Sequence, residues 1–218
     1  MTRRPLLLGH RGARAVKAIP ENTFSSFDLA LAHGCDGFEF DVRLTADGEA
    51  VVCHDAKNEG IEIARASVEE LPQLPRLREV LARYQHSAFL DIELKVGGLE
   101  KIAVKLLREA TPSHGYVVSS FLPEALCAVH AEDSAIPLGL ICETAAQLKR
   151  WRQLPVAYVI LHHKLALRSV IRPVQSEGRK VLVWTVNGVP AMQRLAKWGV
   201  DGMVSDDTER LTETLGVT

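Results

Sequence analysis

Short runs of apolar and β-branched residues alternate along the chain with longer stretches whose apolar positions recur every three or four residues. The short runs have the length and composition of buried strands, and the longer stretches have the period of a helix with one buried face. The segments 24–31 and 99–107 show this helical period. Eight strands are predicted, at residues 6–9, 37–43, 88–95, 116–120, 138–143, 157–162, 180–187 and 201–205.

This alternation of strands and helices predicts the α/β class, with a parallel sheet covered by helices. Eight units are enough to close the sheet, so the expected fold is a (β/α)₈ TIM barrel, and an open doubly wound sheet is the competing architecture. The chain has no linker or low-complexity stretch, so its residues 1–218 are expected to form a single domain. We expect the segment 58–70 to be a loop.

The segment 39–54 breaks the alternation, because it contains two β-rich arms on either side of Asp47-Gly48. Asp-Gly favours a two-residue hairpin turn, since both positions tolerate a positive φ. With this pair as the loop, the numbers of paired residues sum to 95, which sets Asp41 opposite His54. A three- or four-residue loop would shift the pairing by about one residue. We therefore expect a hairpin that protrudes after the second strand and returns His54 to the level of Asp41.

Composition and charge narrow the class of partner. Hydrophobic residues make up 47% of the 218 positions, enough for a sizeable core, and the formal net charge is −1. This charge gives no reason to expect nucleic acid or an anionic membrane surface as a partner. Any affinity for a phosphate group would therefore have to come from a local site.

The cysteines and the first residues bear on the compartment. Cys35, Cys53, Cys127 and Cys142 form no CxxC pair and no zinc-ligand spacing, so we expect reduced thiols. The first nine residues offer only three leucines in a row, too few for a secretory signal or a membrane helix. The sequence thus predicts a cytoplasmic protein without stable membrane insertion, as a monomer or a homodimer.

Two clusters of residues with reactive side chains lie at the C-terminal ends of the first two predicted strands. His10-Arg11 combines a histidine, a residue type that can accept or donate a proton, with a guanidinium that can bind phosphate, although an isolated His-Arg pair also suits a solvated loop. Glu39 and Asp41 alternate on one face of a strand, where uncompensated carboxylates would be costly. A hard cation such as Mg²⁺ or Ca²⁺ would satisfy them, and so would a salt bridge to arginine.

Two further clusters lie at the same end of the predicted barrel, where active sites of such barrels are built. In Asp91-Ile-Glu93-Leu-Lys95 the three charged side chains share a face, with Asp91 deeper. Glu93 could complete a three-carboxylate metal site and Lys95 could bind a phosphate oxygen, or the two could form an internal ion pair. His54-Asp55 adds a second histidine. Two histidines with three carboxylates suit acid–base chemistry around a metal.

These motifs resemble, in order, the signature of the glycerophosphodiester phosphodiesterase family. The resemblance rests on His10-Arg-Gly12, Pro20-Glu-Asn-Thr23, Glu39-x-Asp41 and Thr45-x-Asp-Gly48 followed by His-Asp55. It continues through the segments 90–95, 118–121, 183–187 and 199–202, and so spans nearly the whole chain. The spaced N-terminal motif is highly specific, whereas the later pieces are individually weak.

The resemblance implies a TIM barrel that hydrolyses glycerophosphodiesters to sn-glycerol 3-phosphate and an alcohol, with a divalent metal as cofactor. It also implies roles for residues at matching positions: His10 and His54 as the acid–base pair, Glu39, Asp41 and Glu93 as metal ligands, and Arg11 and Lys95 as phosphate contacts. The sequence does not distinguish the acid from the base, and we favour His10 as the base.

Glu21 falls on the family's Glu-Asn-Thr element, where it could support the site. Its carboxylate also suits the dipole of the following helix, with Asn22 or Thr23 as an ordinary cap. Phe121 and Trp184 are candidates for an apolar wall against the substrate, or for plain packing. Of His162 and His163, at most one can reach the mouth of the barrel, because adjacent strand residues face opposite ways.

One departure from the family and three rival functions remain. The segment 56–65 replaces a longer family insertion that is expected to contact the leaving group, which leaves the preferred alcohol open.

The rival functions are a lysophospholipase D-type enzyme acting on lipids, a metal-dependent aldolase or isomerase, and an inactive barrel used for binding. The paired histidines with Arg11 favour phosphoryl chemistry over the second, and the complete set of candidate groups argues against the third.

Overall fold

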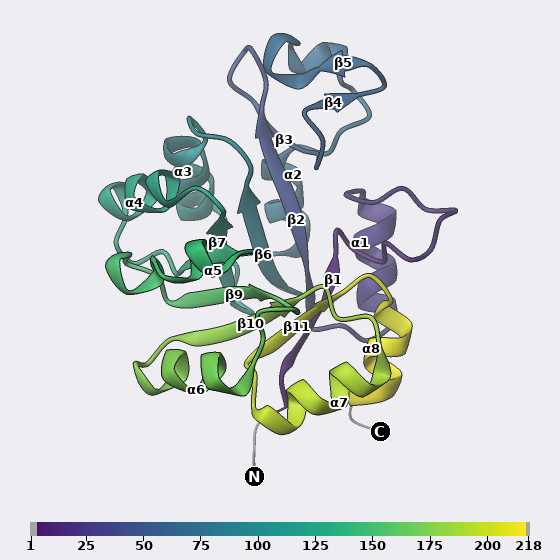
Figure 1. The fold of residues 1–218 in the computed structure, drawn as a ribbon. Helices are drawn as coiled ribbons and strands as arrows, with labels where there is room; N and C mark the ends of the chain where they lie inside the picture. Colours follow the sequence, from purple (N-terminus) through teal and green to yellow (C-terminus); the bar gives the residue numbers. More distant parts are fainter. Residues whose placement is uncertain (1–3, 217–218) are drawn as a thin grey trace.

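A closed ring of eight parallel strands forms the centre of the computed structural model, which describes residues 4–216 (Figure 1). The strands follow the order β1-β11-β10-β9-β8-β7-β6-β2, and β1 pairs with β2 to close the ring. Helices lie between successive strands and cover the outside (Figure 1). The predicted TIM barrel is therefore confirmed, and the open doubly wound sheet is excluded.

The secondary-structure elements agree closely with the predicted pattern. The barrel strands are β1 (Leu6–His10), β2 (Gly37–Leu44), β6 (Phe89–Leu94), β7 (Tyr116–Ser120), β8 (Leu138–Cys142), β9 (Tyr158–His162), β10 (Lys180–Trp184) and β11 (Gly202–Ser205). The helices are α1 (Phe24–Ala32), α2 (Leu77–Tyr84), α3 (Glu100–Glu109), α4 (Pro123–Glu132), α5 (Ala145–Leu148), α6 (Arg168–Ser176), α7 (Val189–Trp198) and α8 (Thr208–Leu215). The seventh strand ends at Trp184, three residues before its predicted end.

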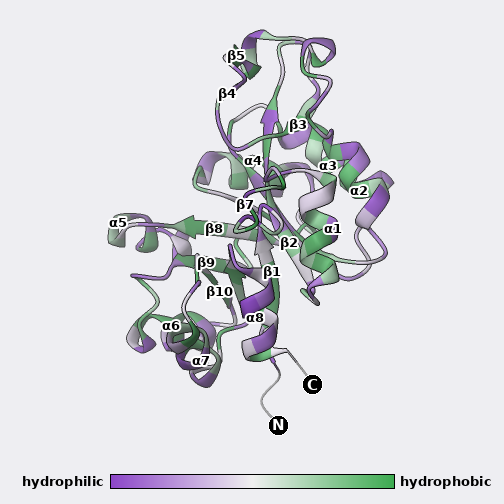
Figure 2. Ribbon diagram, turned by 90° about the vertical axis from the view of Figure 1, so that its right-hand side faces the viewer, coloured by the Kyte–Doolittle hydropathy of each residue, from purple (hydrophilic) through white to green (hydrophobic). Residues whose placement is uncertain are grey.

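Strand β2 shows how the sequence builds the two faces of the barrel wall. Phe38 and Phe40 point outward and pack with Phe27 of α1, and the rings of Phe27 and Phe38 stack with centroids 4.2 Å apart. The alternate residues Glu39 and Asp41 face the interior, because successive strand side chains point to opposite faces. In Figure 2 the barrel strands β8 and β9 are mostly green, the colour of apolar residues.

The barrel interior has an apolar floor below a charged layer. The floor is a cluster of buried side chains contributed by most of the barrel strands: Leu8, Phe89, Val117, Ile141, Tyr158, Ile160, Leu182 and Val204. Carboxylates occupy the inward positions of β2 and β6 next to this floor, where Glu39 pairs in register with Asp91, and Asp41 with Glu93. The packed floor leaves the charged layer accessible from the C-terminal end of the barrel only.

The protruding hairpin is present, but its predicted register is wrong by one residue. Strand β3 (Ala50–Val52) lies antiparallel to β2 outside the ring, and Val42 pairs with Val52. The N–H of Cys53, not of His54, donates to the carbonyl of Asp41 at 3.0 Å.

The length of the hairpin loop explains this difference. The N–H of Thr45 donates to the carbonyl of Glu49, which leaves three loop residues instead of the Asp-Gly pair alone. The Thr45 hydroxyl donates to the Asp47 carboxylate at 2.6 Å, and Gly48 adopts a φ of 81°. A three-residue loop ending in a left-handed glycine is the next most common hairpin connection.

The segment predicted to be a loop, 58–70, contains short ordered elements. It forms part of a small hairpin of β4 (Lys57–Asn58) and β5 (Ile61–Glu62), followed by the 3₁₀ helices η1 (Ile63–Arg65) and η2 (Val68–Glu70). Glu59 and Gly60 form the turn with φ values of 49° and 87°. This pair lacks the Asn-Gly or Asp-Gly signature of a hairpin turn, so no local pattern predicted the turn. A third 3₁₀ helix, η3, spans Trp151–Gln153.

The cysteines are free thiols, as expected. Three are buried and Cys127 is exposed, and burial raises the pKa of Cys142 to about 12, so this thiol is unreactive at neutral pH. Among residues 4–216, none of the helices combines the length and the apolar character needed to cross a bilayer.

Candidate active site

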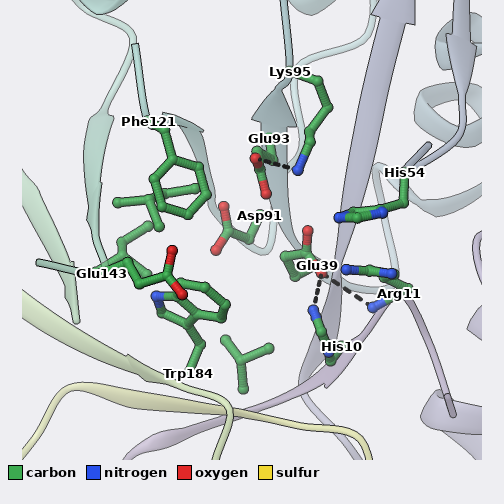
Figure 3. A pocket seen from close by; sticks show the side chains of 13 residues that line it. His10, Arg11, Glu39, His54, Asp91, Glu93, Lys95, Phe121, Glu143 and Trp184 are labelled. Atoms are coloured by element: carbon green, nitrogen blue, oxygen red, sulfur yellow. Dashed lines mark hydrogen bonds and ion pairs between the residues drawn. The ribbon is translucent and has the colours of Figure 1, made fainter. Parts of the chain in front are cut away.

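A cavity of about 290 Å³ opens at the C-terminal end of the barrel (Figure 3). Most of the residues singled out from the sequence line it, namely His10, Arg11, Glu39, His54, Glu93, Lys95, Phe121 and Trp184, together with Asp91, Ile141, Glu143, Ile160 and Val204. Glu21 does not line this cavity but an adjacent groove. Asp41 is only 1% exposed and contacts the cavity residues Arg11 and Lys95.

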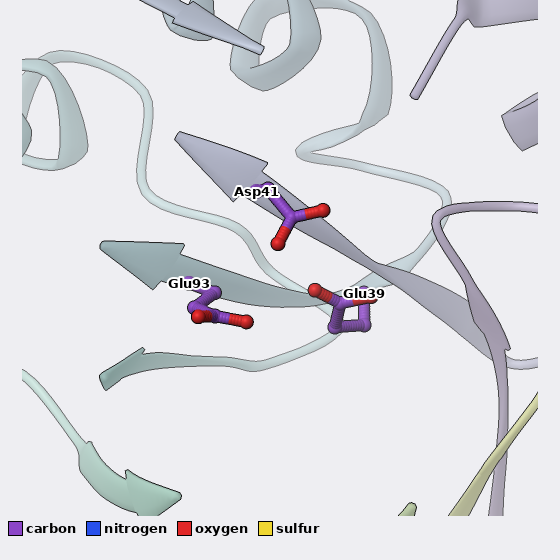
Figure 4. Close-up of side chains that lie close together, drawn as sticks. All are labelled: Glu39, Asp41 and Glu93. Atoms are coloured by element: carbon purple, nitrogen blue, oxygen red, sulfur yellow. The ribbon is translucent and has the colours of Figure 1, made fainter. Parts of the chain in front are cut away.

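Three carboxylates form the acidic centre of the site. Glu39, Asp41 and Glu93 each offer one oxygen, and these oxygens lie within 4.8 Å of one another (Figure 4). All three side chains are buried, and β2 and β6 are neighbouring strands in register. The period-two argument thus placed the three groups on one face correctly. An oxygen-only set of this spacing suits a hard divalent cation.

The electrostatics of this centre are unfavourable without a cation. Burial, and then repulsion from Asp41 and Glu93, raise the pKa of Glu39 well above its ordinary value. Burial likewise raises the pKa of Asp91 to about 7, although the Ser119 hydroxyl donates to it at 2.6 Å. Within residues 4–216, the buried Oε1 atom of Glu39 has no hydrogen-bond donor. A positively charged group is therefore the missing partner.

Asp41 is the carboxylate with the most direct partners. Lys95 Nζ lies 3.2 Å from its Oδ1, Arg11 Nε lies 3.2 Å from its Oδ2, and the Asn22 amide donates to Oδ2 at 2.9 Å. Burial would raise the pKa of Asp41, but these cations and the Asn22 amide lower it overall. Lys95 also contacts Glu93 at 2.8 Å. Both internal ion-pair alternatives considered for these residues are thus present beside the acidic centre.

The loop after β1 brings Arg11 to the cavity through an unusual backbone conformation. Arg11 has a φ of 52°, and its N–H donates to Glu39 Oε2 at 3.1 Å. Its carbonyl accepts from the N–H of Asn22 and from the hydroxyl of Ser26. At Gly12, with a φ of 84°, an added Cβ would lie 2.4 Å from Ser26 Oγ. The glycine is required here because the loop packs directly against α1.

His10 points its Nε2 atom toward the carboxylates and its Nδ1 atom away from them. Nε2 lies 3.9 Å from Glu39 Oε2, while Nδ1 lies 2.7 Å from Oδ1 of Asp206. Burial would raise the pKa of Asp206, but hydrogen bonds with His10 and Asn187 lower it below its ordinary value. An ionised Asp206 favours the tautomer with the proton on Nδ1, which leaves the Nε2 lone pair facing the cavity.

His54 reaches the same cavity from the hairpin. Its Nδ1 atom lies 2.7 Å from Oδ1 of Asp55, and its carbonyl accepts two hydrogen bonds from Arg43. Desolvation lowers the pKa of His54 below its ordinary value, although Asp55 and Asp41 act in the opposite direction. His54 is more accessible than His10, with 35% of its side chain exposed against 11%.

The wall opposite the histidines is largely aromatic. In Figure 3, Phe121, Trp184 and Glu143 lie on the far side of the cavity from His10, Arg11 and His54. The rings of Phe121 and Trp184 meet edge to face with centroids 5.8 Å apart, so the two side chains pack against each other and also line the cavity. His162 packs on Trp184, and the acidic cluster of the described residues includes neither His162 nor His163.

Several site residues escaped the sequence reasoning. Asp206 follows β11 directly and Glu143 follows β8, so both obey the rule that functional residues gather at the C-terminal ends of barrel strands. Asn22 was considered only as a helix cap, whereas it binds Asp41, and Thr23 is the actual N-cap of α1. Glu21 forms ion pairs with Arg11 and Arg14 at 2.6 Å, so it supports Arg11.

Comparison with known proteins gives a consistent result. The profile of the "Glycerophosphoryl diester phosphodiesterase family" matches residues 10–210. A glycerophosphodiester phosphodiesterase of Caldanaerobacter subterraneus is 30% identical over an alignment that covers 94% of this chain and 96% of the relative.

Solved structures agree with this match. A phosphodiesterase of Oleispira antarctica, solved in complex with the product sn-glycerol 3-phosphate, superposes with a TM-score of 0.86 at 26% identity, covering 98% of each chain. A glycerophosphodiester phosphodiesterase of Parabacteroides distasonis superposes with a TM-score of 0.87 at 22% identity, covering 99% of this chain and 98% of the other. Since the family profile covers nearly the whole barrel and its cavity, this chain belongs to the glycerophosphoryl diester phosphodiesterase family, whose members hydrolyse phosphoric diesters.

Proposed function

We propose that this chain hydrolyses glycerophosphodiesters to sn-glycerol 3-phosphate and an alcohol, with a divalent cation and two histidines. One arrangement carries the proposal: three carboxylates within 4.8 Å of one another lie beside Arg11 and Lys95, next to a cavity that both histidines line. The product complex of the Oleispira relative supports the same class of small-molecule substrate.

The residues present fit a divalent cation. Glu39, Asp41 and Glu93 would hold it, because hard cations prefer oxygen ligands and Glu39 Oε1 lacks a donor among the described residues. Mg²⁺ and Ca²⁺ both suit this donor set. When bound, the cation supplies positive charge that stabilises the charge developing on the phosphoryl oxygens.

The remaining groups divide the work of binding and proton transfer. Arg11 presents a planar guanidinium for two phosphate oxygens, and Lys95 presents a point charge. His10, with Nε2 free toward the cavity, accepts the proton of the nucleophile. Two groups could act as this nucleophile: water, or the neighbouring glycerol hydroxyl of the substrate. Attack by the hydroxyl would first form a cyclic phosphate, which is then hydrolysed.

His54 suits the role of the acid that protonates the leaving alkoxide. It lines the catalytic cavity and also a groove of about 550 Å³ between the segment 20–23 and the hairpin. The leaving alcohol would extend into this groove, since His54 lines both spaces and the aromatic wall bounds the opposite side of the cavity. The short segment 56–65 contributes part of the groove lining, so it is where we expect the choice of alcohol to be made.

The division of roles is tested with leaving groups of different acidity. A p-nitrophenyl ester of glycerol 3-phosphate needs little protonation of its leaving group, whereas glycerophosphocholine needs it fully. We expect His54→Ala to lose at least about 100-fold in kcat on glycerophosphocholine and much less on the p-nitrophenyl ester. His10→Ala should lose a similar factor on both. Equal losses for His54→Ala on both substrates would contradict its role as the acid.

The substrate class is tested by a panel of diesters. Release of glycerol 3-phosphate from choline, ethanolamine, glycerol and inositol diesters is compared with hydrolysis of a lysophospholipid. Turnover of the headgroup diesters supports the proposal. Turnover of the lysophospholipid alone would replace it with a lysophospholipase D-type activity.

A further inference from the structure

Arg14 lies outside the catalytic cavity but contacts two carboxylates that bind cavity residues. Its Nε donates to Glu21 Oε2 at 2.6 Å, and its NH1 atom donates to Asp206 Oδ1 at 3.2 Å. Each carboxylate then holds a different group of the site. Glu21 Oε1 accepts from Arg11 at 2.6 Å, and Asp206 Oδ1 lies 2.7 Å from Nδ1 of His10.

These contacts form one continuous network of polar and charged side chains in the order His10, Asp206, Arg14, Glu21, Arg11. The network joins the end of β11 to the loop between β1 and α1, where the first and last strands of the barrel pair. The backbone strengthens this link, because the N–H of Ala15 donates to the carbonyl of Asp206 at 2.9 Å. The exposed fraction falls from 34% for the side chain of Arg14 to 12% for Arg11 and 11% for His10.

The geometry points to Arg14 as a positioning residue that holds the proposed base His10 and the proposed phosphate contact Arg11 in fixed relation to each other. The inference rests on the proposed function for the roles of those two residues. Arg14 itself touches neither the cavity nor any atom that would react.

Arginine is suited to this position because its planar fork offers two directed donors at once. Without it, Glu21 and Asp206 would face one another as like charges with no bridging cation. Each would then hold its partner less firmly, since a carboxylate freed on one side gains rotamers. Arg11 has a further reason to need support, because its backbone adopts a positive φ.

The network has two arms, Glu21 with Arg11 and Asp206 with His10, and we expect separable kinetic effects from them. Glu21→Gln weakens the hold on Arg11 and should mainly raise KM, since a phosphate contact is made in the ground state and the transition state alike. Asp206→Asn disturbs the tautomer of His10 and should mainly lower kcat. Arg14→Ala should do both, with a loss of about tenfold or more in kcat/KM.

The experiment measures kcat and KM of the metal-loaded enzyme on glycerophosphocholine, and the dissociation constant for sn-glycerol 3-phosphate by calorimetry. Arg14→Ala is compared with Arg14→Lys, which keeps the positive charge but not the planar fork, and with two double variants that combine Arg14→Ala with Glu21→Gln or with Asp206→Asn. We expect Arg14→Lys to retain part of the wild-type kcat/KM. In the double variants the losses in kcat/KM should not be additive. Lys17→Ala is the matched control, because it removes an exposed cation from the same loop.

Three results would overturn the inference: kcat and KM both within about twofold of the wild type in Arg14→Ala, equal losses in Lys17→Ala, or fully additive losses in the double variants. If Arg14→Ala does not fold, Arg14→Lys and Arg14→Gln carry the same comparison. If the wild type hydrolyses no diester, the proposed function fails, while weaker binding of sn-glycerol 3-phosphate in Arg14→Ala and Glu21→Gln still supports the arm that holds Arg11.

Discussion

Glu39 is a buried carboxylate in an unfavourable electrostatic environment when no cation is bound. Its side chain is 6% exposed, its Oε1 atom lacks a donor among the described residues, and its pKa is raised by burial and by neighbouring carboxylates. A buried carboxylate of this kind destabilises the fold at neutral pH unless a cation binds. The ionised Glu39 side chain should therefore lower the free energy of unfolding without metal and raise it when metal is bound.

Glu39→Gln tests both halves of this statement. In EDTA we expect the variant to be more stable than the wild type by about 1 kcal/mol, since the amide carries no charge to desolvate. With Mg²⁺ or Ca²⁺ the order should reverse, because the wild type gains about 2.7 kcal/mol at a cation concentration of about 100 Kd and the variant gains little. Chemical unfolding in both conditions measures this, with exposed Glu124→Gln as the control. A variant that is less stable in EDTA as well would contradict the account.

The lowered pKa of Asp206 predicts how the free energy of unfolding depends on pH. Its pKa is below the ordinary value, so its stabilising interactions are present above the unfolded pKa of about 4 and are lost as pH falls through the folded pKa. In EDTA, Asp206→Asn should lower the free energy of unfolding by about 2 kcal/mol near neutral pH. The difference from the wild type should shrink in acid below about pH 4.

Urea unfolding across this pH range provides the measurement for Asp206. Asp55→Asn is the comparison, because Asp55 makes a similar contact with His54 but is 78% exposed, and exposed pairs contribute little. A difference for Asp206→Asn that stays constant or grows in acid would show that its effect is not due to the ionised carboxylate.

The sequence identified the site residues that lie in recognisable local patterns, and it missed those that depend on closure of the barrel. His10, Glu39, Asp41 and Glu93 follow from strand periodicity and from the motif. The contact of Asp206 with His10 joins residues 196 positions apart, and it exists only because β11 lies beside β1. No local pattern carries such information.

At the scale of elements, the strands were predicted within one to three residues, whereas the hairpin register was wrong. Strand positions follow from burial on both faces, which produces continuous apolar runs. The hairpin register depends on the loop length, and this was decided by the Thr45 hydroxyl, which bonds to Asp47 and accepts from the N–H of Glu49. Side-chain contacts of this kind stabilise a three-residue loop that the Asp-Gly pair alone does not reveal.

The left-handed conformation of Gly48 gives this loop a testable property. An added Cβ at Gly48 would meet no atom within 4 Å, so Gly48→Ala should cost only backbone strain, about 1 kcal/mol of unfolding free energy. Gly97→Ala is the control, since Gly97 has no positive φ and its nearest contact is 3.7 Å away. Urea unfolding of both variants measures the difference. A stabilised Gly48→Ala would argue against the three-residue loop.

At the scale of the whole molecule, the barrel brings distant segments to one rim. The acidic centre comes from β2 and β6, one histidine from the end of β1, the other from the hairpin, and the aromatic wall from the residues at and after the ends of β10 and β7. A packed floor closes the interior below them. This arrangement explains why a short chain with a net charge of −1 can offer a concentrated site for a phosphodiester.

The most direct test of the account is the release of sn-glycerol 3-phosphate from glycerophosphocholine with EDTA, and again after Mg²⁺ or Ca²⁺ is restored. We predict no turnover in EDTA, turnover on restoration of the cation, and loss of that turnover in His10→Ala and Glu39→Ala. Turnover that persists in EDTA or in Glu39→Ala would contradict a site built around these carboxylates. Absence of turnover from folded, metal-loaded protein on every headgroup diester would contradict the proposed reaction itself.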